Sequence, residues 1–445
     1  MTKGNILKDL SDFISIQSVS ADLTKRNEMD RAVVFLTKKI KKLGFNVEIL
    51  EKNGSPSAIF AQYSVSGAKK TIGIYGHYDV QPADPIDEWT VKPFELTQRK
   101  GKLLGRGVAD NKGHVIQNIA AIGELIHSGS LKSNVIFLIE GEEECGSESF
   151  LSYISMKKQE LSSIDVFYIT DVGMHAKSVP QIIYALRGLA YFELSVEIGK
   201  RDLHSGVYGN AVLNPAQVLA DLLAKMKDIT TGEVLIPGFY DDVRKVKQDE
   251  MDLLLKGAIS DVNFTKETGT YVVTSMRKVP SFLAPKIFPS LDVHGIESGF
   301  TGEGPKTIIP RKARVKFSCR LVEYQNVKNI EKLIHKFIDM HIPTGVKYLL
   351  QTYSYDDPFY TSIEDPYIKS TAKILSSHFS HETVLMREGG SVPAAEMMQR
   401  HFQIPVILTG FVLPDSNLHA PDENFDEEML FEGIDALKKV YGSIV

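Results

Sequence analysis

The sequence predicts an α/β protein with a mixed, mostly parallel sheet, helices on both of its faces, and a smaller α+β domain inserted into it. Near-continuous apolar runs, separated by helical segments, indicate strands that are buried on both faces of a sheet. In the middle of the chain apolar residues alternate with polar ones, which indicates a second sheet with one face toward water. Because the first pattern returns near the end of the chain, the second domain is predicted to be an insertion.

The first domain is expected to begin with a helix and to continue into buried strands. Apolar residues recur at helical spacing from Val33 to Leu43, and Gly44 ends that run. The strands are expected at residues 57–63, 71–76, 134–139, 166–170 and 405–409. The last strand lies beyond the alternating segment, so the same sheet is expected to resume after the insertion.

The inserted domain has its own succession of elements. Strands are expected at 192–198, 291–296, 315–321 and 347–355, with helices opening at Asn214-Pro215 and running from Ile330 to Ile338. The order β-α-β-β-α-β is that of a ferredoxin-like unit. We therefore predict residues 187–355 as the inserted domain and residues 1–186 with 356–445 as the domain that holds it. The long segment 229–289 is expected to contain short helices.

The composition excludes several classes of protein. The chain has 445 residues and a net charge of -5, so it lacks the positive field that attracts a nucleic-acid backbone. No apolar run approaches the ~18 residues of a membrane span. Lys8, Asp9 and Asp12 interrupt any signal-peptide core, and two cysteines provide no disulfide framework. We expect a cytoplasmic enzyme with neither nucleic acid nor membrane as a partner.

Histidine and acidic residues follow the predicted strands or precede a helix, where ligands bind to an open α/β sheet. These residues are His77, Asp79, Asp110, Glu143, Glu144, Asp171 and His419. Each has an ordinary alternative, such as a helix cap for Asp110 or a solvated acidic loop for Glu143 and Glu144. Chance does not explain why all of them fall at one sheet edge. A mixed nitrogen and oxygen set suits zinc, with manganese as a harder substitute.

The residue types also fit hydrolysis assisted by two metal ions. Two divalent ions ~3.5–4 Å apart can activate a water and polarise a carbonyl. One carboxylate must then bridge the ions, and another must move the proton without being a ligand. Glu143 and Glu144 can supply a base and a ligand, and Asp79 can orient the His77 imidazole.

Nine segments together resemble one known family over nearly the whole chain. They are GHYDVQP, WTVKPFEL, GRGVADNKG, EGEEECGS, RDLHSG, HGIESGFTGEGPKTIIP, FSCRLV, REGGSVP and NLHAPDENF. The sequence resembles the dinuclear zinc hydrolases that include carnosinase, cytosolic nonspecific dipeptidase, glutamate carboxypeptidase, acetylornithine deacetylase and succinyl-diaminopimelate desuccinylase. The dipeptidase branch is most similar, because of RDLHSG, KTIIP, REGGSVP and a long lid. The resemblance implies a zinc-exopeptidase-like catalytic domain and a lid through which two copies dimerise.

The resemblance also implies roles for individual residues. His77 and Asp171 would hold one metal ion, Glu144 and His419 the other, and Asp110 would bridge them. Glu143 would be the general base, Asp79 would support His77, and His204 would reach the partner subunit's site to steady the oxyanion. Residues that would bind the substrate's carboxylate and backbone are Thr307, Arg320, Arg387, Gly390 and Ser391. A cis peptide between Asp110 and Asn111 is also implied.

Three positions depart from the family pattern. Asn111 stands where the dipeptidases usually have aspartate, Asn210 where a second glycine is common, and Cys145 where a serine or another small residue is usual. None of them removes a predicted ligand.

Two enzymatic readings share this metal site. The first is hydrolysis of dipeptides or short peptides with a free C-terminal carboxylate, and the alternative is deacylation of N-acyl amino acids. A third reading is a binding or scaffold protein that kept the fold. We expect an enzyme, because a binding protein needs neither Glu143 nor a complete ligand set, and the long lid favours dipeptides over N-acyl amino acids.

Overall fold

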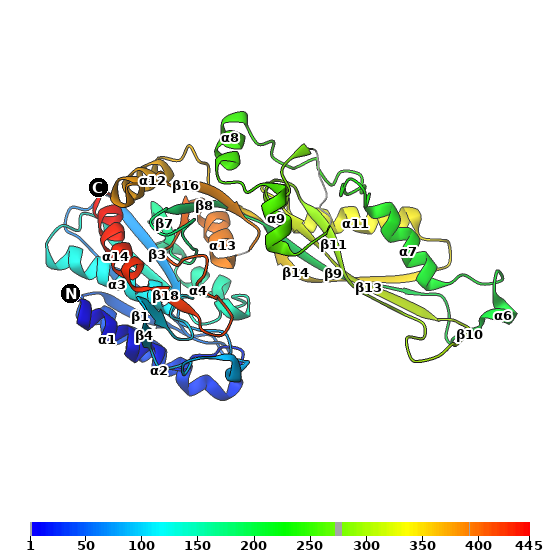
Figure 1. Cartoon of the computed structure of the whole chain (residues 1–445), viewed down its shortest axis with the longest axis horizontal. Coiled ribbons are helices and arrows are strands. Elements are labelled where there is room, and N and C mark those ends of the chain that lie inside the picture. The colour runs from blue at the N-terminus through cyan, green and yellow to red at the C-terminus, as the bar shows by residue number, and fades with distance from the viewer. Residues whose placement is uncertain (1, 272–277, 391) are drawn as a thin grey trace. The chain divides into compact units, whose positions relative to one another are not determined.

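The computed structural model describes residues 2–271, 278–390 and 392–445, which form two compact units. Unit 1 comprises residues 1–184, 361–386 and 392–445, and unit 2 comprises residues 185–360 and 387–391. Figure 1 traces both units through the chain. No described helix has the length and apolar character needed to cross a membrane.

Unit 1 is built on a mixed sheet whose centre is parallel. The strand order is β1-β2-β6-β3-β7-β17-β8, and β16 also pairs with β8. Strands β6, β3, β7 and β17 run parallel to their neighbours in that order, while the outer pairs are antiparallel. The strands are β1 (Asn46–Leu50), β2 (Ala58–Tyr63), β3 (Thr71–His77), β6 (Asn134–Glu140), β7 (Val166–Ile169), β8 (Gln181–Leu186), β16 (Val384–Glu388) and β17 (Val406–Thr409). The buried strands expected from the apolar runs are all present.

Helices cover both faces of this sheet, as neighbouring residues of β3 show. A Cβ on Gly76 would lie 2.7 Å from Val115 of α3, so this residue faces α3. Tyr75 points the other way, and its ring packs edge-on against Phe150 of α4 at 5.7 Å. The helices of unit 1 are α1 (Lys3–Ile14), α2 (Arg26–Lys42), α3 (Lys112–His127), α4 (Phe150–Met156), α5 (Lys158–Leu161), α12 (Pro366–Phe379), α13 (Pro393–Phe402) and α14 (Glu427–Gly442).

A small three-stranded sheet completes unit 1. It has the order β18-β5-β4, formed by β4 (Thr97–Arg99), β5 (Lys102–Leu104) and β18 (Asn424–Asp426). The antiparallel pairing of β18 with β5 brings together two segments that lie more than 300 residues apart in the sequence.

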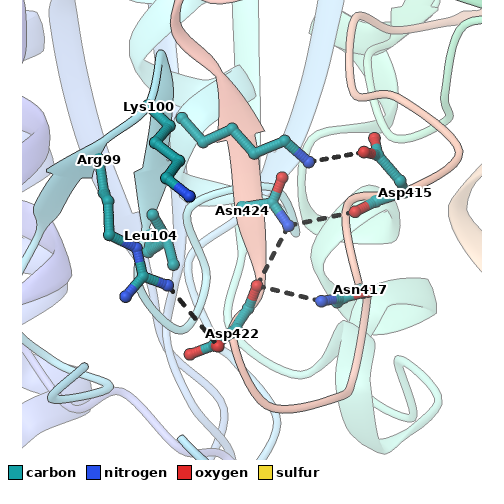
Figure 2. Close-up of a pocket in the computed structure, with 8 residues that line it drawn as sticks. Arg99, Lys100, Leu104, Asp415, Asn417, Asp422 and Asn424 are labelled. Carbon is teal, nitrogen blue, oxygen red and sulfur yellow. Dashed lines mark hydrogen bonds and ion pairs between the residues drawn. The ribbon is translucent and has the colours of Figure 1, made fainter. Parts of the chain in front are cut away.

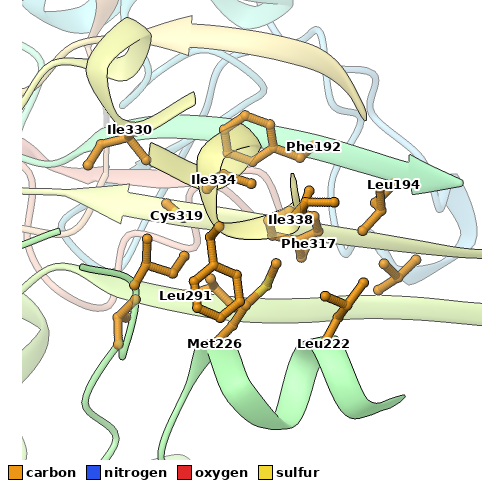
Figure 3. Packing of buried hydrophobic residues seen from close by; sticks show 14 of the residues in the cluster. Phe192, Leu194, Leu222, Met226, Leu291, Phe317, Cys319, Ile330, Ile334 and Ile338 are labelled. Atoms are coloured by element: carbon orange, nitrogen blue, oxygen red, sulfur yellow. The ribbon is translucent and has the colours of Figure 1, made fainter. Parts of the chain in front are cut away.

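Unit 2 has the predicted ferredoxin-like order of elements. Its antiparallel sheet has the order β11-β13-β9-β14, formed by β9 (Gly188–Glu197), β11 (Ser290–Ser298), β13 (Lys312–Leu321) and β14 (Lys347–Asp356). Helices α7 (Pro215–Met226) and α11 (Val327–His341) pack on it. Alternate residues of β9 and β13, such as Phe192 and Phe317, meet Leu222 and Ile334 in one buried cluster (Figure 3).

Shorter elements occupy the remaining segments of unit 2. Helices α8 (Gln248–Lys256), α9 (Asp261–Thr268) and α10 (Ala284–Ile287) lie within 229–289, as expected. A two-stranded ribbon is formed by β10 (Leu203–His204) and β12 (Ile308–Ile309), and the short helix α6 (Ser205–Tyr208) follows β10. Strand β15 (Phe359–Tyr360) pairs with Ala185 and Leu186.

Candidate metal centre

The seven predicted residues from the strand ends all lie in unit 1. His77 ends β3, Glu143 and Glu144 follow β6, and Asp171 follows β7. These three strands are adjacent and parallel, so their carboxyl ends deliver the side chains to one edge. Asp110 precedes α3, and His419 lies between β17 and β18.

The buried His77 imidazole forms the first group of ligand atoms. Its Nε2 lies 3.0 Å from Asp110 Oδ1 and 3.5 Å from Asp171 Oδ2. Its Nδ1 lies 3.1 Å from the backbone carbonyl of Asp79, to which the neutral ring can donate. Nε2 is buried and has no hydrogen-bond partner among the described residues. A buried imidazole nitrogen that faces two carboxylates can bind a metal ion once it has released its proton.

His419 forms the second group with Asp110 and Glu144. Its Nε2 lies 2.9 Å from Asp110 Oδ2 and 3.3 Å from Glu144 Oε2. Gln81 donates to Glu144 Oε2 at 2.8 Å and fixes that carboxylate. Hydrogen bonds that His419 donates to the carboxylates of Asp110 and Glu144 raise the pKa of His419 to about 10.

Asp110 belongs to both groups, and each of its carboxylate oxygens faces a different histidine. Within each group the ligand atoms lie within 4.8 Å of one another. The unpartnered Nε2 of His77 and the shared carboxylate fit a pair of divalent cations bridged by Asp110. His77 and Asp171 could hold one ion, and Glu144 and His419 the other.

Asp79 links the two halves of the centre. Its buried carboxylate accepts the backbone N–H of Glu144 at 3.0 Å and that of Glu143 at 3.3 Å. The same carboxylate lies 3.4 Å from His77 Nδ1. Asp79 therefore orients the imidazole and also positions the turn that carries both glutamates.

Glu143 stands apart from the ligand groups. Neither group of described residues includes it, although its neighbour Glu144 is a member. Burial raises the pKa of Glu143 well above its ordinary value, and Asp171 and Asp110 add to this rise while His77 opposes it. A half-buried carboxyl with a raised pKa that is not itself a ligand suits proton transfer.

The side-chain amide of Asn111, next to Asp110, forms hydrogen bonds that hold a neighbouring ligand. The Asp110–Asn111 peptide is cis, as the resemblance implied. Asn111 Nδ2 donates to the carboxylate of Asp171 at 2.5 Å and to the carbonyl of Thr170 at 2.8 Å. An ionised aspartate could not donate either bond, so the amide secures Asp171 in a way that the usual residue cannot.

The loop that carries His419 is anchored on both sides. Asn424 Nδ2 donates to the carbonyls of Asp415 and Asp422 (Figure 2). Lys102 pairs with Asp415 at 2.6 Å. His419 itself has a φ of +59°, a left-handed conformation that is uncommon for residues with a side chain. The anchors hold this loop in the shape that presents the imidazole.

The other predicted residues lie in unit 2. His204 is exposed on the β10–β12 ribbon, where its Nδ1 accepts the N–H of Gly206 at 3.0 Å. Thr307 is beside it, because its carbonyl accepts the N–H of Ser205 at 3.1 Å. Arg320 is half-buried on β13, Gly390 is exposed, and Ser391 lies outside the described residues.

Arg387 is buried in an ion-pair network. Its guanidinium lies 2.6 Å from Glu250 and 2.5 Å from Glu323. Arg244 contacts the same two glutamates at 2.6 and 2.9 Å. In this arrangement two carboxylates already neutralise the cation predicted to bind substrate.

The match to known proteins covers the whole metal centre. Residues 73–442 match peptidase family M20/M25/M40. The chain belongs to this family. It is 31% identical to a Cys-Gly metallodipeptidase of Schizosaccharomyces pombe, over 97% of this chain and 94% of that relative. It is 28% identical to the Beta-Ala-His dipeptidase of Homo sapiens, over 96% of this chain and 87% of that relative.

A solved structure shows the same fold. It is an M20 family metallo-carboxypeptidase from Sulfolobus solfataricus, with 31% identity, a TM-score of 0.86 and 99% of both chains covered. The predicted fold class, the family and its dipeptidase branch are thereby confirmed. This M20 peptidase chain is an enzyme of the metallopeptidase class.

Binding of metal to this peptidase is expected to release protons. Burial lowers the pKa of His77, but the carboxylates of Asp171 and Asp110 raise this pKa by more than burial lowers it. The pKa of His77 therefore lies well above its ordinary value. His419, with a pKa of about 10, holds its proton at pH 7.5. Since a metal ion needs the neutral imidazole, loading both ions should release protons, about one of them from His419.

Calorimetry in buffers of different ionisation enthalpy measures this release. Apparent zinc affinity should rise with pH between 6 and 9, because the concentration of protons that compete for the imidazole falls. His419→Ala should release about one proton fewer than the wild type. Zinc binding without a buffer-dependent enthalpy would contradict the expected protonation of His419.

Proposed function

We propose that this peptidase hydrolyses the amide bond of dipeptides or short peptides with a free C-terminal carboxylate. The observation that carries the proposal is the shared carboxylate of Asp110, which faces His77 through one oxygen and His419 through the other. Half-buried Glu143 lies outside the ligand groups and remains available for proton transfer. The relatives named as dipeptidases support the choice of substrate.

The chain's own residues would perform distinct tasks. Two divalent cations supply, when bound, a polarised carbonyl and a more acidic water. Glu143 would accept a proton from the attacking water and return it to the leaving amine. Asp79 would hold the His77 ring and the Glu143–Glu144 turn in place. Zinc is proposed as the ion, with manganese as a substitute, because the ligands combine two imidazoles with three carboxylates.

The inserted domain, residues 187–355, is proposed to act as a lid and as the dimerisation domain. The exposed His204 would complete the partner subunit's site and steady the oxyanion. Thr307, Arg320, Arg387, Gly390 and Ser391 would contact the substrate's carboxylate and backbone. For Arg387 this requires that a substrate carboxylate take over part of its pairing with Glu250 and Glu323.

A cytoplasmic location belongs to the same proposal. Cys145 and Cys319 are both free, and Cys145 is exposed. An exposed free thiol is the usual state in a reducing compartment.

A panel of substrates tests the activity. The purified protein is loaded with zinc or with manganese and offered dipeptides, tripeptides and N-acetyl or N-succinyl amino acids. We expect turnover of dipeptides that is lost with a chelator and restored by the metal. Release from N-acyl amino acids without hydrolysis of any peptide would favour the deacylase instead. No turnover of either class, with two ions bound, would favour the binding protein.

A further inference from the structure

Glu423 occupies the junction between the two loops that carry Asp110 and His419. Directly after it, Asn424 pairs with Leu104 in the β18–β5 ladder. The backbone carbonyl of Glu423 accepts the N–H of Gly105 at 3.0 Å. The segment leading to His419 is thus fastened alongside the segment leading to Asp110.

The buried Glu423 side chain accepts four hydrogen bonds from the Asp110 loop. Oε2 accepts from Arg106 Nη1 and from the N–H of Gly107, both at 2.8 Å. Oε1 accepts from the N–H of Ala109 at 2.9 Å and from that of Asp110 at 3.0 Å. One carboxylate therefore satisfies three backbone donors of the turn that ends in the bridging residue.

The backbone of this turn is tightly constrained, and the turn depends on contacts from other segments to keep its shape. Gly107 has a φ of +84°, and a Cβ there would lie 2.5 Å from Val80. Without an acceptor, the N–H groups of Ala109 and Asp110 would be left without a hydrogen-bond partner, which is unfavourable for each group. The loop would relax, and the Asp110 carboxylate with it.

We propose that Glu423 is a positioning residue for the metal centre, which fixes Asp110 and His419 relative to one another. The inference rests on the ligand roles in the proposed function. It predicts an asymmetric effect, because the Glu144–His419 group contains both Asp110 and His419. The other group keeps His77 and Asp171, which are held by strands β3 and β7 and by Asn111.

Zinc binding by Glu423→Gln tests this role. Glutamine keeps the length of the side chain and one oxygen acceptor, but its amide N–H groups would face two of the donors. We expect one zinc ion to bind as in the wild type and the second to bind about 10–100-fold more weakly, measured by competition with a chromophoric chelator. His419→Ala provides the reference for a protein with one impaired half.

Gln117→Ala is the matched control for general loss of stability. Gln117 is equally buried and belongs to α3, but it donates to the carbonyls of Met429 and Leu430 rather than to either ligand loop. The Gln117→Ala variant should bind both zinc ions with wild-type affinity, even if its melting temperature falls as far as that of Glu423→Gln.

The zinc affinities of these variants distinguish a failure of this inference from a failure of the proposed ligand roles. Wild-type affinity for both ions in Glu423→Gln overturns the inference and leaves the ligand roles intact. Equal weakening of both ions in Glu423→Gln and Gln117→Ala also overturns it, because stability alone would then explain the loss. A wild type that binds fewer than two ions overturns the proposed ligand roles and this inference together.

Discussion

Replacing Glu143 with glutamine is expected to lower dipeptide turnover by about 10²–10⁴-fold while both zinc ions stay bound. Glutamine has almost the same size, but it cannot accept the proton of the attacking water. Glu143 is absent from both groups of described ligand atoms, so its loss should leave their geometry unchanged. Steady-state rates, together with zinc counted by elemental analysis after gel filtration, separate the two effects.

Glu144→Gln is the matched variant, because it changes the adjacent residue in the same way. Glu144 lies 3.3 Å from His419 and is a member of the second ligand group. We expect this variant to bind the second ion more weakly and to recover part of its activity at high zinc concentration. Metal loss in Glu143→Gln with full retention in Glu144→Gln would show that the two roles are exchanged.

The ligands were predictable from sequence because most of them stand at or just after the carboxyl ends of buried strands. His77 and Asp171 each come at or just after the end of an apolar run, and adjacent parallel strands bring such positions together. The two glutamates after β6 follow the same rule. The ferredoxin-like unit was equally accessible, since alternation along β9 and β13 marks its core-facing side.

The supporting residues were not predictable in the same way. Glu423 and Arg106 lie 317 positions apart, and no local sequence pattern predicts that they form an ion pair. From sequence, Asn111 is only a departure from the family pattern. In the structure its side-chain amide donates a hydrogen bond to the carboxylate of Asp171. The acidic and histidine residues stand out by type, but the hydrogen bonds that orient them depend on packing between distant segments.

Arg387 illustrates the limit for substrate contacts. The motif REGGSVP predicts a cation for the substrate's carboxylate, and the structure places that cation against Glu250 and Glu323. Glu250 lies on a helix within the long segment between Ile229 and Pro289, where the sequence predicts helices but not their partners. Such pairing depends on tertiary packing that residue types alone do not specify.

His204→Ala is expected to lower turnover by about 10²–10³-fold, equivalent to the ~2.7–4 kcal/mol that an oxyanion donor contributes, and to leave zinc content unchanged. His204 is exposed and lies in unit 2, whereas every ligand atom of the two groups belongs to unit 1. The variant should therefore separate oxyanion stabilisation from metal binding. His294→Ala, another unit 2 histidine that contacts Ser318 on β13, is the control and should retain turnover.

Mixing His204→Ala subunits with Glu143→Gln subunits then tests whether the histidine acts in the partner's site. A mixed dimer would have one site with both defects and one with neither, so activity should return to about one quarter of the wild type after random exchange. Differently tagged subunits, purified through both tags, establish that exchange has occurred. If doubly tagged dimers stay as inactive as either single variant, His204 serves its own subunit. A protein that sediments as a monomer while fully active would refute completion by a partner altogether.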